Sequence, residues 1–279
     1  MTRSLIITAD DLGIDPRRDD GILLAYARGA ITQASLMVRG PSAARAARDS
    51  MRIGLPIGLH LDLTETPACA PHAAIRSLLD TTGNKLGKHG LREAVARGIV
   101  ECAHVEEETR AQLRAFRALT GVDATHVDGH QHVHTIPALA TWLAPVLREA
   151  SVRTTRIPEQ HDVHVDDPKS AAFYRSVASD AAASRARYAA EGIGSTEAFI
   201  GLDLMGFASS AEKLDAALRS ITTGSIELMC HPGFIGTGID DFNESPAREH
   251  ELAVLLSLPF AQSVEAGRVR LTSFSSLHR

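Results

Sequence analysis

The sequence predicts a single α/β domain (residues 1–279) built as a distorted (β/α) barrel with seven or eight parallel strands. The first observation is that short apolar segments alternate with longer amphipathic segments along almost the whole chain of 279 residues. The second is that the sequence has no internal repeat, low-complexity tract or Ser/Pro-rich linker. Barrels of roughly 250 residues commonly form one domain. An open, doubly wound sheet is the alternative fold.

Apolar, β-rich segments predict strands at residues 5–9, 34–38, 57–61, 126–128, 153–157, 199–202, 226–230 and 269–271. Amphipathic segments predict helices at residues 19–28, 104–120, 137–149, 170–191, 211–220 and 246–257. Gly29 and Gly121 are typical helix stops, and Pro137 has the fixed φ that suits a helix start. Residues 66–90 show little periodicity, and residues 158–168 contain Pro158, His161, His164 and Pro168, so we expect long loops near 66–90 and 158–195. Loops of that length in compact domains are often functional.

Composition excludes several classes of protein. The chain is 44% hydrophobic and 23% charged, with a net charge of −5, which is typical of a globular protein. It has no basic stripe for nucleic acid and no apolar run near the roughly 20 residues that span a membrane. The apolar segment near the first residue is too short for a signal peptide, and acidic residues follow it at once. Three widely spaced cysteines, without a CxxC pair, predict a reducing, cytoplasmic setting.

Two adjacent carboxylates, Asp10 and Asp11, follow the first predicted strand. The carboxyl ends of strands are where α/β enzymes build their sites. Neighbouring carboxylates repel each other unless a cation lies between them or one of them takes up a proton. Taken alone, an aspartate that caps the turn at Gly13 is the more common arrangement.

The predicted strand at 57–61 places His60 and Asp62 on one face, because Leu59, Leu61 and Leu63 alternate with them. In a barrel with an apolar outer face, the polar face lies toward the interior or its mouth. Taken alone, His60 is more often a hydrogen-bonded core histidine than a metal ligand.

The densest signal is a histidine tract at residues 126–134. Its polar members His126, Asp128, His130, His132 and His134 all stand at even positions, so an extended backbone would project them from one side. Same-face residues are about 6.6 Å apart along a strand, so one metal ion can reach only one or two of them. Histidine-rich short tracts commonly bind metals, which predicts a metal or catalytic role. Imidazole suits Zn, Fe, Ni or Co, whereas mixed His/Asp sets also accept Mg or Mn.

Two later residues stand at strand ends. Arg156 follows the strand at 153–157, where an ordinary ion pair with a surface carboxylate is the alternative to a site role. His231 lies between Cys230 and the rigid Pro232. We exclude a Cys–His nucleophile, because neighbouring strand residues point to opposite faces and Cys230 suits a small core position.

Five segments occur in order across residues 6–234, and together they resemble the YdjC-like carbohydrate deacetylases, the group that includes chitooligosaccharide deacetylase. The segments are TADDLG (8–13), SLMV (35–38), GLHL (58–61), HVDGHQHVH (126–134) and ELMCHPG (227–233). The resemblance implies a (β/α) barrel related to the polysaccharide deacetylases. It also implies one divalent metal ion, Mg or Zn, and removal of acetyl groups from N-acetylated sugars.

The resemblance also assigns roles. It implies Asp11, His60 and His130 as metal ligands. By analogy with the wider polysaccharide deacetylases, Asp10 would be the general base, Arg156 would orient it, and His231 would protonate the leaving amine. Further residues expected to support the metal ligands or contact substrate are Asp128, His132 and Met229.

The chain departs from the chitobiose-type pattern at two positions: Gln131 stands in place of a histidine, and Gly129 in place of a serine. Neither is an expected ligand, so these departures concern the substrate pocket. The regions 66–90 and 158–195 lie outside the five segments and should set sugar specificity. The expected partner is an N-acetylated sugar, with no nucleic acid or membrane partner, and the chain could form a homodimer.

Two other functions compete with deacetylation. A metal-dependent phosphoesterase or amidohydrolase on a similar barrel would ordinarily have more ligands, a second metal and often an HxH motif on the first strand, where this chain has Asp10 and Asp11. A non-catalytic sugar-binding protein would lack a base or a ligand, and none is missing from the motifs.

Overall fold

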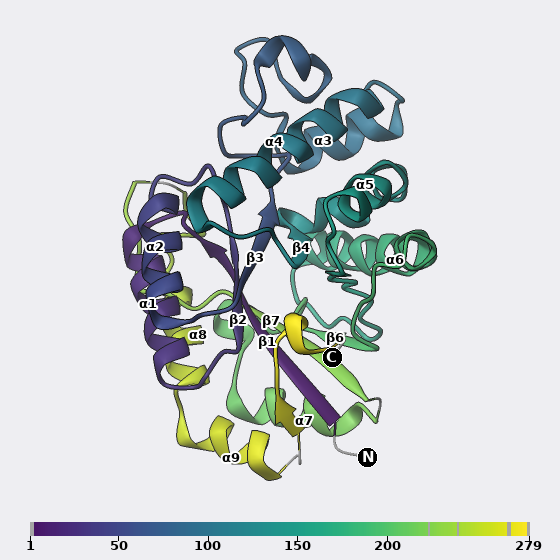
Figure 1. Ribbon diagram of the computed structural model, residues 1–279. Coiled ribbons are helices and arrows are strands. Elements are labelled where there is room, and N and C mark those ends of the chain that lie inside the picture. Colours follow the sequence, from purple (N-terminus) through teal and green to yellow (C-terminus); the bar gives the residue numbers. More distant parts are fainter. Residues whose placement is uncertain (1–2, 223, 239, 267–268, 278–279) are drawn as a thin grey trace.

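The computed structural model describes residues 3–222, 224–238, 240–266 and 269–277. Over these residues eight strands, all parallel, form one curled sheet in the order β5-β4-β3-β2-β1-β7-β6, with β8 also paired to β1 (Figure 1). The strands are β1 Arg3–Leu12, β2 Gln33–Leu36, β3 Ile57–Leu61, β4 His126–Gly129, β5 Thr154–Thr155, β6 Ala198–Ile200, β7 Ser225–Cys230 and β8 Val269–Leu271. The predicted α/β class and distorted barrel are confirmed.

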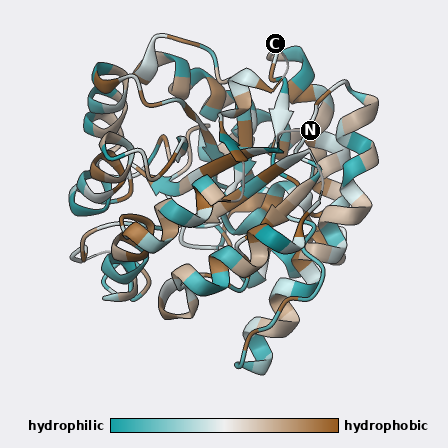
Figure 2. Ribbon diagram, turned by 90° about the horizontal axis from the view of Figure 1, so that it is seen from below, coloured by the Kyte–Doolittle hydropathy of each residue, from teal (hydrophilic) through white to brown (hydrophobic). Residues whose placement is uncertain are grey.

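Helices surround the curled sheet. They are α1 Pro16–Ala27, α2 Ala43–Ile53, α3 Gly87–Ala96, α4 Cys102–Thr120, α5 Pro137–Glu149, α6 Pro168–Ala190, α7 Ala211–Ser220, α8 Ala247–Leu255 and α9 Leu258–Ala266. Neighbouring helices pack in the order α8, α1, α2, α4, α5, α6 around the outside. Figure 2 shows hydrophobic strands at the centre, ringed by helices that carry both hydrophobic and hydrophilic residues. None of the described helices is long and apolar enough to cross a membrane.

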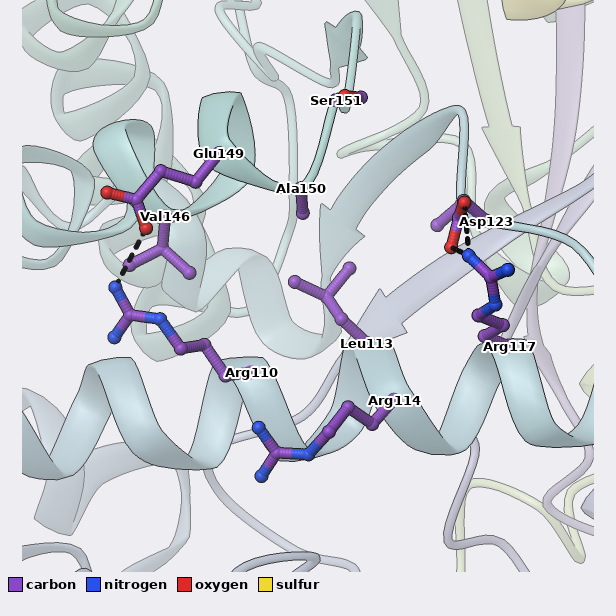
Figure 3. A pocket seen from close by; sticks show the side chains of 10 residues that line it. Arg110, Leu113, Arg114, Arg117, Asp123, Val146, Glu149, Ala150 and Ser151 are labelled. Atoms are coloured by element: carbon purple, nitrogen blue, oxygen red, sulfur yellow. Dashed lines mark hydrogen bonds and ion pairs between the residues drawn. The ribbon is translucent and has the colours of Figure 1, made fainter.

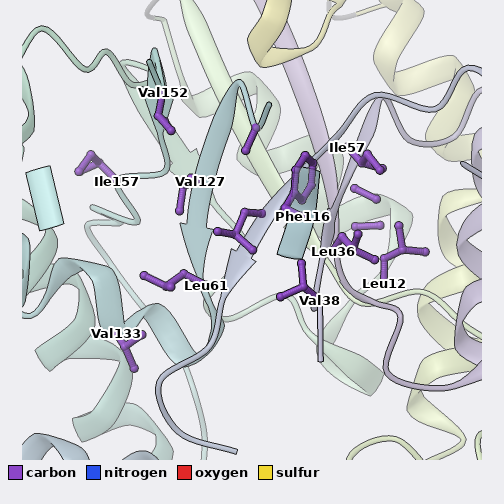
Figure 4. Packing of buried hydrophobic residues seen from close by; sticks show 14 of the residues in the cluster. Leu12, Leu36, Val38, Ile57, Leu61, Phe116, Val127, Val133, Val152 and Ile157 are labelled. Atoms are coloured by element: carbon purple, nitrogen blue, oxygen red, sulfur yellow. The ribbon is translucent and has the colours of Figure 1, made fainter. Parts of the chain in front are cut away.

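The two faces of the sheet differ sharply in polarity. Leu36, Ile57, Leu61 and Val127 point outward into one hydrophobic cluster with the helices, and Figure 4 shows them against Phe116 of α4. The alternate strand positions point into the barrel and are mostly polar, yet they are buried: Thr8, Asp10, Gln33, Ser35, His60, His126, Asp128 and Glu227. The period-two alternation of a strand therefore places an apolar core outside the sheet and a polar core inside it.

The barrel is not closed by a continuous ladder. At the edge strand β5 the chain instead forms an isolated bridge with Gly194, four residues before the other edge strand β6: the Gly194 N–H donates to Arg153 O at 2.9 Å, and its carbonyl accepts from Thr155 N at 2.9 Å. The segment after β8 packs Phe274 beneath the interior, with its ring centroid 5.1 Å from that of His126. Its backbone N–H donates to Gln33 Oε1 at 2.9 Å, which ties this segment to β2.

The first strand contains an irregularity on which the site depends. Its register against β2 shifts between Ala9 and Leu12, and Asp11 adopts a left-handed conformation with φ 63°. Successive residues of a regular strand point to opposite faces. Because the chain bends at Asp11, the side chains of Asp10 and Asp11 both reach the mouth of the barrel. The strand therefore extends past the predicted end at residue 9 to Leu12.

The six predicted helices are confirmed, with ends that shift by a few residues. Three further helices, α2, α3 and α9, were not expected. The buried face of α2 consists only of Ala43, Ala46, Ala47 and Ser50, so it carries no strong hydrophobic periodicity.

Helices or 3-10 turns occupy part of each of the two regions in which a long loop was predicted. The region 66–90 includes the 3-10 turns His72–Ala74 and Arg76–Leu78, and its end begins α3. Residues 158–167 form a loop, as predicted, whereas most of the region up to residue 195 is α6, which confirms the helix predicted at 170–191 and not a loop over the whole region. Asp167 caps that helix by accepting from Ser170 N, and Pro168 begins it.

A close backbone contact joins α1 to the segment that follows β7. A Cβ added at Gly21 would lie 2.5 Å from Gly233 Cα, closer than real Cβ atoms approach backbone. Gly21→Ala should therefore destabilise the fold by about 1–3 kcal/mol through overpacking. The matched control is Gly90→Ala in α3, where the nearest atom is Leu86 Cβ at 3.4 Å and alanine should stabilise by up to about 1 kcal/mol. Urea unfolding of both variants checks this, and equal effects would contradict the packing argument.

Candidate active site

The candidate site lies at the carboxyl ends of β1, β3, β4, β5 and β7. Seven of the residues singled out in the sequence meet there: Asp10, Asp11, His60, Asp128, His130, Arg156 and His231. They come from segments up to about 220 residues apart in the chain, and most of them are buried. The parallel sheet brings them together because the carboxyl ends of its strands share one edge.

Asp11, His60 and His130 form the first group. Asp11 Oδ1 lies 3.4 Å from His60 Nε2 and 3.1 Å from His130 Nδ1. One oxygen or nitrogen atom from each of the three residues lies within 4.8 Å of the others, as required of side chains that share one metal ion. Although burial opposes its charge, hydrogen bonds with His130 and His60 hold the pKa of Asp11 well below its usual value.

The surroundings of His60 suit a metal ligand. Its Nδ1 donates to Asp128 Oδ1 at 2.8 Å, which leaves Nε2 directed at Asp11. Burial opposes a positive charge here, but the carboxylates of Asp128, Asp10 and Asp11 outweigh it and raise the pKa of His60 to about 9. These carboxylates favour a positive charge that either a proton or a divalent cation can supply, because metal binding displaces ligand protons. A carboxylate behind a ligating histidine is a recurrent feature of metal sites.

A second group of possible ligands, Asp10, His60 and Asp128, is also close enough to share an ion. Both oxygens of Asp10 already accept hydrogen bonds from Arg156, and Asp128 forms an ion pair with Arg156 and accepts from Ser35 Oγ at 2.6 Å. The first group leaves its ligand atoms facing one another and fits a cation better.

Arg156 is fully buried and binds three carboxylates. Its Nη1 and Nη2 lie 2.6 and 2.7 Å from the two oxygens of Asp10, Nη2 lies 3.0 Å from Asp128 Oδ2, and Nε lies 3.0 Å from Glu227 Oε1. We call Asp10, Asp128, Arg156 and Glu227 the Arg156 cluster. The alternative of an ordinary surface ion pair is therefore wrong, because the side chain has no solvent exposure.

Burial and mutual charge shift the pKa values of the residues in the Arg156 cluster. Burial raises the pKa of Asp10 even though Arg156 acts in the opposite direction. Burial also raises the pKa of Glu227 to about 7, again against the effect of Arg156. The three carboxylates in turn raise the pKa of Arg156, although burial opposes this. One guanidinium thus holds more negative charge than it can neutralise.

His231 lies beside Asp10, with its Nε2 3.9 Å from Asp10 Oδ2. Its backbone is held from α8: the N–H donates to Glu251 Oε2 at 2.7 Å, and the carbonyl accepts from Arg248 Nη1 at 3.1 Å. Burial lowers the pKa of His231 well below its usual value, although Asp11 acts in the opposite direction. Cys230 points away into the outer hydrophobic cluster, as the strand alternation predicts.

The histidine tract does not stay extended. β4 ends at Gly129, residues 130–135 form a 3-10 turn, and Gln131 and His132 are left-handed with φ 52° and 59°. The expectation of one shared face is therefore wrong beyond the strand. His132 packs its ring against Phe199, and His134 Nε2 lies 2.9 Å from Arg156 O.

The remaining expected site residue, Met229, lies on the inner face of β7. It packs in a small apolar cluster with Val177, Phe199 and Leu202, away from the first ligand group. The structure therefore gives Met229 and His132 no contact with the three possible ligands.

Sequence reasoning missed several residues of the site. Glu227 could have been found, because it shares a strand face with Met229 in the quoted segment at 227–233. Glu65 lies on a loop, with its Oε2 2.9 Å from His130 Nε2. Arg18 lies on α1, with its Nη1 3.5 Å from Asp11 Oδ2. No local pattern in the sequence marks these last two, because only the fold brings them to the site.

A separate pocket of about 430 Å³ lies between α4 and α5 (Figure 3). It includes Ala124 and Ser151, which precede β4 and β5, so it is at the amino ends of the strands and opposite the site. Its three arginines are ion-paired with carboxylates: Arg110 with Glu149, Arg114 with Glu107, and Arg117 with Asp123. This pocket offers no comparable chemistry.

The burial of the Arg156 cluster predicts how the loss of Arg156 changes the free energy of unfolding. Arg156→Met should lower the free energy of unfolding by about 3–5 kcal/mol, because it leaves buried carboxylates without a counter-charge. The control is Arg219→Met, which removes an exposed i,i+4 pair with Asp215 and should change stability by about 0.5 kcal/mol or less. Thermal and urea unfolding at pH 7 measure both, and a similarly small loss in the two variants would contradict the argument.

Comparison with known proteins finds relatives and a solved structure that match nearly the whole chain. The chain is 38% identical to the human protein named carbohydrate deacetylase, covering 98% of this chain and 90% of that protein. It is 29% identical to the chitooligosaccharide deacetylase of Yersinia pestis, covering 98% and 99% of the two chains. A crystal structure described as a putative cellobiose-phosphate cleavage protein from Enterococcus faecalis has the same fold, with a TM-score of 0.75, 24% identity and 99% coverage of both chains. The family described as YdjC-like protein matches residues 4–266, and the chain belongs to that family.

Proposed function

We propose that this protein is a divalent-metal-dependent deacetylase that hydrolyses the N-acetyl amide of an amino sugar or a short chitooligosaccharide-like sugar and releases acetate. The observation that carries the proposal is the convergence of Asp11, His60 and His130 beside Asp10 and His231. The names of the relatives, carbohydrate deacetylase and chitooligosaccharide deacetylase, support the same reaction.

In this proposal Asp11, His60 and His130 hold the metal ion. When bound, the ion polarises the amide carbonyl and lowers the pKa of water. Three protein ligands with room for further ligands are typical of a catalytic site rather than a structural one. Two imidazoles and one carboxylate favour Zn²⁺ over Mg²⁺, because Mg²⁺ prefers oxygen ligands.

Asp10 is the proposed general base. It is next to the possible ligand Asp11, and both of its oxygens accept hydrogen bonds from Arg156 at 2.6 and 2.7 Å. This bidentate contact fixes the carboxylate plane and favours its ionised form, in which it can accept a proton from water. Arg156 acts here as a positioning residue, and its contacts with Asp128 and Glu227 hold it in place.

His231 is the proposed proton donor to the leaving amine. Its Nε2 faces Asp10 across 3.9 Å, so the groups that accept and donate protons flank the same space. The amine is a poor leaving group until it is protonated, and a general acid contributes roughly 10²–10⁴ in rate. The backbone contacts with Glu251 and Arg248 keep the ring at the mouth of the barrel.

Other expectations rest on the sequence alone. The homodimer and the cytoplasmic location stay predictions. The cysteines Cys69, Cys102 and Cys230 are all free thiols, which is compatible with a reducing compartment.

Removal of metal tests the proposal. The purified protein should release acetate from N-acetylglucosamine oligomers, lose at least 90% of that activity after treatment with a chelator, and recover it with added Zn²⁺ or Mg²⁺. Acetate release is measured with a coupled assay, and metal content by mass spectrometry. A phosphatase activity on sugar phosphates without acetate release would favour the phosphoesterase alternative. Sugar binding without turnover would favour the non-catalytic one.

The roles of the two aspartates can be separated. Asp10→Asn should lower kcat by roughly 10²–10⁴ because the base is lost, whereas metal content should stay at the wild-type level. Asp11→Asn should reduce both, because it removes a ligand charge. Steady-state kinetics and metal analysis of the same preparations measure these effects. Loss of metal from Asp10→Asn in proportion to its activity would instead make Asp10 a ligand.

A further inference from the structure

The two histidines beside Asp11 have parallel surroundings. Each directs one ring nitrogen to Asp11 Oδ1 and the other to a second carboxylate. For His60 the second carboxylate is Asp128, which is fully buried inside the barrel. For His130 it is Glu65, whose Oε2 lies 2.9 Å from Nε2 and whose side chain is 46% exposed. The carboxylate behind His130 is thus supplied by a loop at the surface.

The loop that carries Glu65 is held by a neighbouring buried aspartate. Asp62 Oδ1 accepts from the backbone N–H groups of Thr64 and Glu65 at 2.7 and 3.0 Å, and Asp62 Oδ2 accepts from Thr66 N at 2.6 Å. These bonds fix the backbone of residues 62–66 in a tight turn. The conformation of the turn, rather than chance contact, therefore sets where the side chain of Glu65 begins.

That turn is itself anchored to the domain. The buried Lys85 Nζ donates to Asp62 O at 2.6 Å and lies 3.5 Å from Asp62 Oδ2 and 3.3 Å from Glu108 Oε1. Gln112 of α4 donates to the same Asp62 carbonyl at 2.6 Å. A buried lysine paired with two carboxylates resists displacement, because separating them would leave charges uncompensated in the interior.

Glu65 also receives a hydrogen bond from Gln131 Nε2. Gln131 is one of the two left-handed residues that follow His130, and it stands where the chitobiose-type pattern has a histidine. The side-chain amide thus joins the turn at 62–66 to the turn at 130–135. Glu65, which faces Nε2 of His130 on the side of the ring away from Asp11, is therefore held by contacts from both turns.

We propose that Glu65 is a positioning residue for the metal ligand His130, a role that rests on the proposed metal site. As an ionised carboxylate, Glu65 accepts a hydrogen bond from the Nε2–H group of His130. The lone pair of Nδ1 is then directed toward Asp11. A neutral histidine binds metal through the nitrogen that carries no proton, so its partner on the other nitrogen selects the ligand atom. Glu65 is the surface counterpart of Asp128, and metal affinity depends on the anchored loop that carries it.

The test is a Zn²⁺ titration of the metal-free protein in competition with a chelating dye. Glu65→Ala should raise the Kd for Zn²⁺ by about 10–100-fold, because the orientation of His130 is lost. Glu65→Gln should raise it less, because its amide oxygen still accepts a hydrogen bond. The matched control is Glu107→Gln on α4, a partly exposed glutamate whose pair is Arg114, and its Kd should equal that of the wild type.

The melting temperature of the metal-free variants gives the second readout. It should match the wild type, since Glu65 is partly exposed, whereas the melting temperature with Zn²⁺ should rise less in Glu65→Ala than in the wild type. A wild-type Kd in Glu65→Ala overturns this inference and leaves the proposed function standing. Failure of the wild-type protein itself to bind Zn²⁺ or Mg²⁺ would instead overturn the proposed metal site, and this role of Glu65 with it.

Discussion

The fully buried guanidinium of Arg156 allows this barrel to have an acidic interior. An unpaired carboxylate in such surroundings costs several kcal/mol, and the Arg156 cluster holds three. A lysine could not replace the arginine, because only the planar guanidinium presents donors to Asp10, Asp128 and Glu227 in fixed directions at once. Without that group, the three buried carboxylates would have no shared counter-charge, and burial would favour their neutral forms.

From this cluster, hydrogen bonds reach both ends of the barrel. Toward the mouth, Asp128 holds His60, and His60 faces Asp11. Toward the opposite end, Glu227 accepts from Thr8 Oγ1, whose oxygen accepts from Gln33 Nε2. Gln33 in turn accepts from the backbone of Phe274. The segment after the last strand is therefore linked to the site through the interior by hydrogen bonds between buried polar side chains.

Sequence patterns predicted the strands well, because alternation of apolar and polar residues reports directly on the two faces of a curled sheet. His60 is the clearest case: its flanking leucines placed it on the inner face, and it lies there. The prediction that the polar residues of 126–134 share one face was wrong beyond Gly129, because alternation cannot reveal the left-handed backbone of Gln131 and His132. The same limit applies at Asp11, whose left-handed conformation lets two neighbouring aspartates face one site. Such strained backbone persists only where surrounding contacts enforce it, and those contacts are not visible in sequence.

The site thus has two parts with different freedom to change. The possible metal ligand His60 and the Arg156 cluster belong to strands or strand ends, and each of them is buried against several others, so a substitution at one unbalances the rest. Glu65 and Gln131 stand on turns that follow β3 and β4 and are at least partly exposed, so they can change with less effect on the interior, whereas His231, which follows β7, is buried beside Asp10. Within a family that keeps one reaction, variation in the sugar accepted should therefore concentrate in the loops. Because Glu65 belongs to one of these loops and also faces His130, a change in that loop would also alter the surroundings of the proposed metal site.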